Sequence, residues 1–211
     1  MSTQTDMTID QAPAAVIKAR KVVADWEAKA STAREEARRV DSESGREILE
    51  NPNAAEKITL KVQTLERQAR AYDNAAREAR DQEKAAWRKA VEAEAKQLEK
   101  DATTMRRDAA KIEAEESKLI DKLEALQGVR YEPVLGRPTS LDHGVYVRGD
   151  DLPRETKSDD LKALAAGAEA QTKMVRHALE TGQANGYEGQ SLIGQLDVPP
   201  ITAAALNAGA L

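Results

Sequence analysis

Apolar residues recur every three or four positions between residues 12 and 50, and the positions between them are mostly polar or charged. A mean spacing of 3.5 residues is typical of the buried seam of a coiled-coil helix. Asp10 is expected to cap this helix, and Pro13 suits its first turn. Pro52 is expected to end it, since the residue before a proline avoids helical backbone. The two rows of this seam are Val16, Val23, Ala30 and Ala37, and Ala19, Trp26, Ala33 and Val40.

A second helix is predicted over residues 54–127, because neither glycine nor proline interrupts this stretch. At 1.5 Å per residue it would be about 110 Å long, and Gly128 suits its end. The seam shifts register after Glu83, a change that locally unwinds a supercoil. Before the shift the seam contains Ile58, Val62, Leu65, Ala69, Tyr72, Ala76 and Ala79. After it the seam contains Trp87, Val91, Leu98, Ala102, Met105, Ala109, Ile112, Leu119, Leu123 and Leu126.

A short turn between two long helices predicts that they pair side by side in opposite directions. If the turn centres on Pro52, residue i lies opposite a residue near 104 − i. Trp26 then meets small residues near Ala76, and large side chains generally meet small ones, as an interdigitated core requires. The same seam would also allow residues 12–50 to pair with another chain. The predicted core of the hairpin consists of Val16, Val23, Trp26, Val40, Ile58, Leu65, Tyr72 and Trp87.

The first helix is too short to cover the second, so residues 95–127 extend beyond it by roughly 50 Å. A helix with an apolar stripe needs a partner. Either a helix predicted over residues 158–181, capped by Ser158 and ended by Gly182, folds back on it, or another subunit covers it. Glu116 interrupts the stripe, and we hypothesise that a basic side chain of a partner reaches it. The predicted interaction residues are Leu98, Met105, Ile112, Glu116, Leu119, Leu123 and Leu126.

The predicted fold is therefore all-α: a long antiparallel coiled-coil hairpin with an extended second helix, then a loop-rich region and a further helix. Residues 1–11 form an N-terminal arm, 12–128 the hairpin, 129–157 a loop-rich docking region, 158–181 a helix and 182–211 a Gly/Ala-rich tail. A small β-hairpin could use residues 130–134 and 145–147. In the tail, residues 201–207 could form one or two helical turns.

The amino-acid composition argues against several classes of function. Phenylalanine and cysteine are absent from the 211 residues, aromatic residues make up 3% and charged residues 33%. Without cysteine, disulfides, thiolate zinc sites and cysteine nucleophiles are excluded. His143 and His177 lie in different segments without a second ligand nearby, and the common nucleotide-binding and hydrolase motifs are missing. We therefore expect no metal, no cofactor and no enzymatic activity.

The charge pattern and the polar start of the chain bear on partners and location. The net charge is −5, and residues 51–100, with eleven basic against nine acidic side chains, form the only basic region. A nucleic acid is therefore an unfavoured partner. No apolar stretch is long enough for a signal peptide or a membrane span, so a cytoplasmic protein without membrane insertion is expected.

The chain resembles bacteriophage structural and scaffolding-type proteins in three features. These are helices rich in Ala, Glu, Lys and Arg over residues 12–127, the lack of cysteine, and a small terminal docking region. This resemblance implies a structural or assembly protein of a capsid, head-tail or scaffolding type, in the host cytoplasm or the virion. Its partners would be other protein subunits, including further copies of itself. The alternatives are a helical hairpin that binds a membrane surface and a packaging protein associated with nucleic acid.

Overall fold

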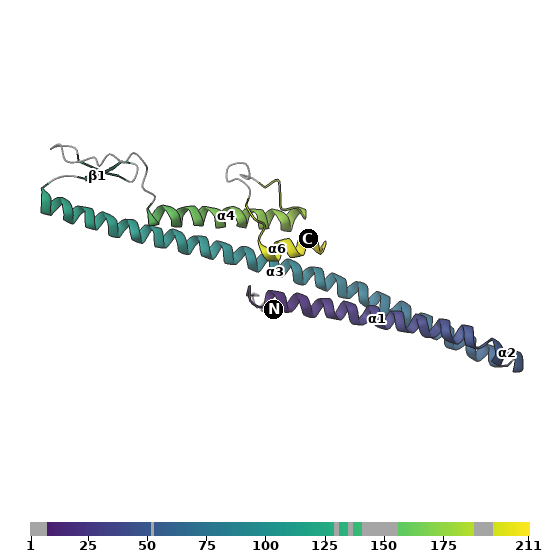
Figure 1. Ribbon diagram of the computed structural model, residues 1–211. Helices are drawn as coiled ribbons and strands as arrows, with labels where there is room; N and C mark the ends of the chain where they lie inside the picture. Colours follow the sequence, from purple (N-terminus) through teal and green to yellow (C-terminus); the bar gives the residue numbers. More distant parts are fainter. Residues whose placement is uncertain (1–7, 52, 129–130, 135–136, 141–155, 188–195) are drawn as a thin grey trace, which may run out of the picture. The chain divides into compact units, whose positions relative to one another are not determined.

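A computed structural model describes residues 8–51, 53–128, 131–134, 137–140, 156–187 and 196–211. The chain is all-α (Figure 1), as its sequence predicts. The helices are α1 (Ala12–Glu43), α2 (Gly45–Glu50), α3 (Ala54–Gln127), α4 (Lys157–Thr181) and α6 (Pro200–Asn207). Two short strands, β1 (Tyr131–Val134) and β2 (Arg137–Ser140), pair antiparallel, with Tyr131 opposite Ser140. The second predicted strand, residues 145–147, lies outside the described residues.

Ser44 interrupts the helix that the sequence predicts over residues 12–50. Its hydroxyl donates a hydrogen bond to the backbone carbonyl of Asp41 at 2.9 Å. Serine hydroxyls that bond to nearby carbonyls compete with helical hydrogen bonds, and Gly45, the next residue, adds backbone freedom. The prediction of a single helix was therefore wrong at this point, and α1 and α2 are separate.

The two predicted N-terminal caps differ from the observed ones by one residue in α1 and by two residues in α4. Gln11, and not Asp10, occupies the N-cap of α1 and makes no capping hydrogen bond to it. Thr156, and not Ser158, caps α4. The Thr156 hydroxyl accepts the N–H of Asp159 at 3.2 Å, and the Asp159 carboxylate accepts the Thr156 N–H, also at 3.2 Å. This reciprocal arrangement is a capping box.

The chain divides into two compact units. The first comprises Met1–Glu94, Leu179–Gly182 and Pro200–Leu211, and the second Ala95–Ala178 and Gln183–Pro199. Helix α3 thus contributes its first part to one unit and its second part to the other, and each unit contains a long antiparallel helix pair.

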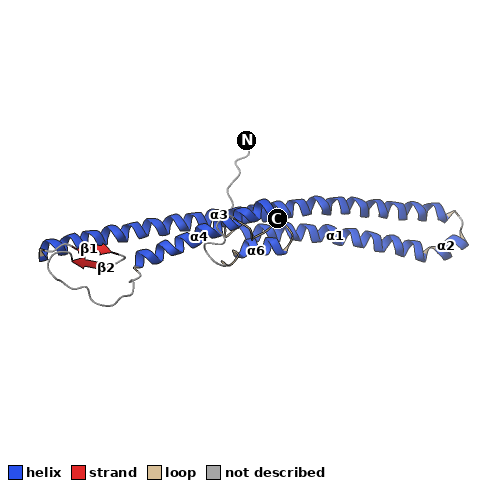
Figure 2. Ribbon diagram, turned by 90° about the horizontal axis from the view of Figure 1, so that it is seen from above, coloured by secondary structure: helices blue, strands red, loops and turns tan. Residues whose placement is uncertain are grey.

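In the first unit, α1 lies alongside the first part of α3 (Figure 2). Glu27 forms an ion pair with Arg80, and one heptad further along Arg34 pairs with Asp73. These two contacts place residue i of α1 beside 107 − i, whereas the ion pair of Arg20 with Glu83 corresponds to 103 − i, so the pairing stays close to the predicted 104 − i. The buried seam consists mainly of Val16, Val23, Ala30, Ala33 and Ala37 of α1 and Ala69, Ala76, Ala79, Trp87, Ala90 and Val91 of α3.

The predicted hairpin core is buried unevenly. Val16, Val23 and Trp87 are buried, whereas Trp26, Val40, Ile58, Leu65 and Tyr72 are half-buried. Trp26 stacks on Tyr72 with ring centroids 5.8 Å apart, a contact that the pairing around Pro52 does not anticipate. Lys29 lies 4.1 Å above the Trp26 ring, where its charge meets the ring's electron-rich face.

In the second unit, α4 lies antiparallel to residues 95–113 of α3, and oppositely charged residues join the two helices at every heptad. Glu99 pairs with Arg176, Arg106 with Glu169 at 2.7 Å, and Glu113 with Lys162. The signs alternate along each helix, so a slip of one heptad would bring like charges together. The pattern therefore specifies the register of α4 as well as its direction.

Candidate interaction surfaces

An apolar groove of about 790 Å³ lies between α3 and α4 in the second unit. Leu98 and Met105, which the sequence predicts as interaction residues, form its α3 wall, and both are half-buried. The facing side of α4 carries small residues, so the two helices leave space between them. The remaining lining residues are Asp101, Asp160, Ala163, Leu164, Gly167, Ala168, Gln171 and Leu196.

The groove combines an apolar wall with negative charge. Asp101 and Asp160 are the charged residues that line it. The Asp101 carboxylate accepts a hydrogen bond from the Gln97 side-chain amide at 2.8 Å. Leu164, on the outer wall, is 58% exposed. The arrangement suits an amphipathic segment with apolar and basic side chains, because such a segment would satisfy both features.

Beyond the groove, the apolar stripe of α3 is exposed. The first turn of α4 lies beside Glu113, whose carboxylate accepts a bond from the Ser158 hydroxyl at 3.4 Å. Past that point Leu119, Leu123 and Leu126 are 59%, 43% and 85% exposed. Ile112 is half-buried and Glu116 is exposed. Helix α4 thus accompanies the part of the stripe up to Ile112, while three leucines of the same stripe are open to solvent.

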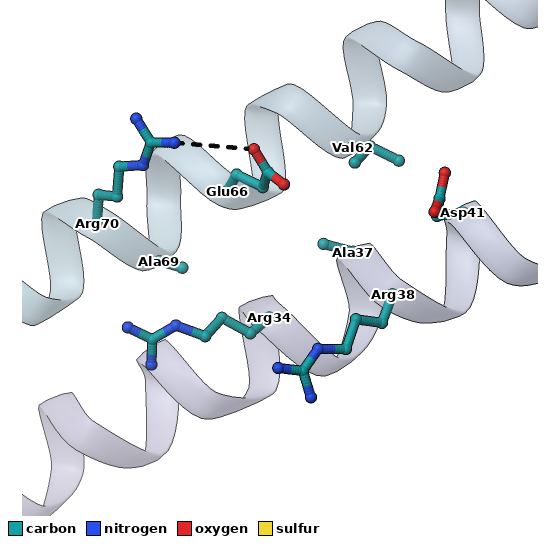
Figure 3. Close-up of a pocket in the computed structure, with 8 residues that line it drawn as sticks. All are labelled: Arg34, Ala37, Arg38, Asp41, Val62, Glu66, Ala69 and Arg70. Carbon is teal, nitrogen blue, oxygen red and sulfur yellow. Dashed lines mark ion pairs between the residues drawn. The ribbon is translucent and has the colours of Figure 1, made fainter.

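A second hollow, of about 330 Å³, lies between α1 and α3 in the first unit. Figure 3 shows the small side chains of Ala37, Val62 and Ala69 directed into it from the two helices. Because alanine occupies the seam on both sides, the helices meet without filling the space between them. The charged residues around it are Arg34, Arg38, Asp41, Glu66 and Arg70.

Two of the three arginines around this hollow form ion pairs. Arg70 forms an ion pair with Glu66 at 4.0 Å (Figure 3), and Arg34 pairs with Asp73 on the facing helix. Ion pairs between exposed side chains contribute little free energy and hold their partners loosely. The hollow is therefore a gap in a thin alanine seam, bordered by solvated charges. Sequence analysis did not single it out, although the alanines at matching seam positions were a usable signal.

Glu94 is a buried, hydrogen-bonded residue that sequence analysis missed. The residue is 3% exposed, and its carboxylate accepts hydrogen bonds from the backbone N–H of Ile201 at 2.9 Å and of Thr202 at 2.8 Å. The Thr202 hydroxyl donates a third bond at 2.6 Å. A carboxylate at a helix N-terminus satisfies free N–H groups and meets the positive end of the helix dipole. Glu94 lies on the seam between Val91 and Leu98, and this acidic interruption could have revealed it.

The titratable groups of the described residues bear on whether this part of the chain could hold a metal ion. Among the described residues, no group of three His, Asp or Glu side chains is arranged to hold a metal ion. His143 falls outside the described residues, and His177 is half-buried. The pKa of Asp108 lies below its usual value because of a hydrogen bond from Lys111, and the pKa of Lys162 is raised by Glu113. Both shifts arise from exposed ion pairs.

Within the part of the chain that the structure describes, no helix has the length and apolar character needed to cross a membrane. No family model matches this sequence, and no match was found among the curated proteins or the solved structures.

Proposed function

We propose that the protein is a non-enzymatic structural or assembly component that binds other protein subunits through the second part of α3. The observation that carries the proposal is the exposure of Leu119, Leu123 and Leu126, at 59%, 43% and 85%. Their spacing of four and three residues puts them on one helix face. A contiguous apolar face at the end of a helix is stabilised when another helix covers it.

The contacts within each unit support a coiled-coil character for both helix pairs. Ion pairs recur at heptad spacing between α1 and α3 and again between α3 and α4. A chain that already forms two such pairs can extend the same packing to a helix of another subunit, since the seam of α3 continues past the first turn of α4. The exposed leucines lie on that continuation.

The acidic groove favours a protein partner over the alternatives. Asp101 and Asp160 line it beside apolar side chains. Carboxylates repel the phosphates of nucleic acids and of anionic lipids. Proteins that bind nucleic acids or anionic membranes usually do so through basic surfaces. A basic amphipathic helix of another subunit meets the same groove with complementary charge. Membrane-surface and nucleic-acid binding are therefore the less favoured functions.

The resemblance of residues 12–127 to bacteriophage structural and scaffolding-type proteins supports a role in a virion or in its assembly. In this proposal the protein acts in the host cytoplasm or within the particle, and it requires no cofactor. Its contacts are made by helices rather than by a catalytic centre.

The proposal is tested by measuring the mass of the protein in solution by light scattering after size exclusion, over a range of concentrations. Replacing Leu119, Leu123 and Leu126 together by serine should reduce an oligomer to the 23.0 kDa chain. Leu49 and Leu60 are also exposed but lie in the first unit, so their replacement by serine is the matched control and should leave the mass unchanged.

Two results would contradict the proposal. A wild-type mass of 23.0 kDa at every concentration would exclude self-association. An oligomer that dissociates equally in the control variant would place the interface elsewhere. Circular dichroism of each variant establishes that the helices are retained.

A further inference from the structure

The groove between α3 and α4 differs from the ion-paired edge of the same helix pair, because its charges have no counterparts. Glu99 and Glu113 each form an ion pair across the two helices. Asp101 and Asp160, which line the groove, form no ion pair with any described residue. No lysine or arginine is among the described residues that line it. The groove therefore carries two negative charges that the described part of the chain does not balance.

Asp101 is placed where a cation would stabilise it. The residue is half-buried, and Leu98 and Met105 lie about one turn before and after it on the same helix. Its carboxylate accepts one described side-chain hydrogen bond, from the Gln97 amide at 2.8 Å, although a carboxylate has about four acceptor positions. A charge that is partly removed from water gains more from an opposite charge than a fully solvated one does.

Gly167 provides a second, independent indication of a partner. It lies in the interior of α4 and lines the same groove. Glycine inside a helix is less favourable than alanine, because it loses more backbone freedom on folding. Its φ is not positive, and a Cβ added to it would meet no described atom within 4 Å. Glycine also occurs where another molecule approaches the backbone closely, so this position is accounted for if a partner packs directly on α4.

The dimensions and lining of the groove suit an α-helix. The α4 wall runs from Asp160 to Gln171, about 17 Å at 1.5 Å per residue, which corresponds to about three helical turns. Leu98 and Met105 on α3 and the exposed Leu164 on α4 provide apolar contacts along it. Helices that bind in grooves present apolar side chains three or four residues apart to such a wall.

We propose that this groove binds an amphipathic helix of a different protein, which carries lysine or arginine beside its apolar residues and packs closely over Gly167. The inference rests on the proposed function, since it names the partner that a subunit-binding protein takes at this site. A second copy of the chain fits less well, because two grooves that face each other would bring the Asp101 and Asp160 carboxylates of both copies together.

The test uses a fluorescein-labelled synthetic peptide of about 18 residues, long enough to form a helix along the groove. Leucines at heptad spacing form one face and lysines flank it, and the control peptide carries glutamate at each lysine position. Fluorescence anisotropy is measured with the full-length protein at physiological salt, where attraction to distant charges is screened. The lysine peptide should bind saturably and about ten times more tightly than the glutamate peptide, since charge complementarity distinguishes the two.

Charge variants show whether this preference arises in the groove. Asp101→Asn combined with Asp160→Asn should remove most of the difference between the two peptides. Glu115→Gln combined with Asp121→Asn removes the same charge from exposed positions of α3 outside the lining and should preserve the difference.

Gly167→Ala separates binding from folding. Alanine should raise the urea concentration at the midpoint of unfolding, because it favours the helix. The added methyl group should also weaken binding of the lysine peptide about fivefold or more, because it occupies the space that the partner needs. A residue with a purely structural role would not change stability and affinity in opposite directions. Ala166→Leu adds volume at an exposed position outside the lining and should leave the affinity unchanged.

Three outcomes would overturn the proposal. The first is no saturable binding of the lysine peptide, or equal affinity for both peptides. The second is undiminished binding to Gly167→Ala. The third is a lower mass of Gly167→Leu than of the wild type in light scattering, which would mean that a second copy occupies the groove.

The proposed function is tested separately. Leu119, Leu123 and Leu126 lie outside the groove lining, so their replacement by serine should leave peptide binding intact whatever it does to the mass. Loss of an oligomer in that variant supports the proposed function even if no peptide binds to the groove. A monomer that binds the lysine peptide supports the groove alone.

Discussion

One carboxylate oxygen of Glu94 accepts both the backbone N–H and the hydroxyl of Thr202, at 2.8 and 2.6 Å. Both side chains are buried, although 108 positions separate them in the sequence. A buried charge is tolerated when hydrogen bonds satisfy it, and here three donors converge on it. The pair therefore attaches the C-terminal helix to the middle of α3.

Glu94→Gln is expected to detach the start of α6. The amide retains the shape of the side chain but loses the charge, and its NH₂ group faces an N–H donor. Bonds to charged acceptors contribute about 1.5–3 kcal/mol, so we expect the free energy of unfolding to fall by about 2 kcal/mol. Urea denaturation measures the loss, and hydrogen exchange of residues 201–205 should accelerate.

Glu92→Gln is the matched control, because Glu92 lies on the same turn of α3 but is exposed. Its substitution should alter neither quantity by more than about 0.5 kcal/mol. Unchanged protection of residues 201–205 in Glu94→Gln would show that packing alone holds α6.

The ion pair between Arg106 and Glu169 should specify register more than stability. Arg106→Glu and Glu169→Arg each set like charges opposite one another, so each should destabilise the second unit. The double exchange should restore stability, with a coupling energy of at most about 1 kcal/mol since both side chains are exposed. Chemical denaturation of the four proteins at low and high salt measures the coupling, which salt should weaken.

Arg107→Glu provides the control for this cycle. The Arg107 guanidinium contacts its neighbour Asp108 at 3.6 Å rather than a residue of α4. A coupling to Glu169 as large as that of Arg106 would mean that the effect arises from general charge and not from the heptad contact.

Hydrophobic spacing was sufficient to predict the all-α class, because a pattern repeated over many turns outweighs local exceptions. The bounds of α3 followed from the absence of glycine and proline over residues 54–127. It failed at Ser44 and Thr156, where one hydroxyl decides a helix boundary through a bond that spacing does not contain. It also failed at Glu94. Whether an acidic seam residue is a solvated exception or a buried anchor depends on a distant segment, here the start of α6.

The candidate surfaces could be predicted from the sequence only in part. Leu98, Met105 and Leu126 follow from the stripe, and the structure places the first two in the groove and the third in solvent. The shape of the groove could not be predicted, because segments distant in the sequence form it. The spacing of apolar residues identifies which face of a helix is apolar. Predicting the volume left between two helices also requires knowing which side chains face one another.

The stacked rings of Trp26 and Tyr72 should stabilise the helix pair of the first unit. Tyr72→Leu retains an apolar side chain but removes the ring contact, so we expect a loss of about 1 kcal/mol in the free energy of unfolding. Tyr72→Phe keeps the ring and should retain most of the stability. Thermal and urea denaturation of both variants check this. Equal losses in the two would assign the effect to the hydroxyl instead.

The capping box of α4 should make the stability of that helix depend on acid pH. The Thr156 hydroxyl donates to the Asp159 carboxylate at 2.7 Å, and this bond holds the pKa of Asp159 below its ordinary value of 3.8. A group whose pKa is lowered by folding stabilises the folded state above the unfolded pKa. That contribution disappears as the pH falls from 3.8 through the folded pKa, because the unfolded state binds the proton first.

Thr156→Val should therefore raise the pKa of Asp159 toward 3.8 and shift the loss of α4 protection to higher pH. A carboxyl-detected NMR titration measures the pKa directly, and hydrogen exchange of the first turn of α4 reports protection. Asp108 is an internal reference, because its lowered pKa arises chiefly from a hydrogen bond with Lys111 and should be the same in both proteins. If the Asp159 pKa does not change while the helix loses protection, the Thr156 hydroxyl stabilises α4 by accepting the Asp159 N–H, and its own bond to the carboxylate does not contribute.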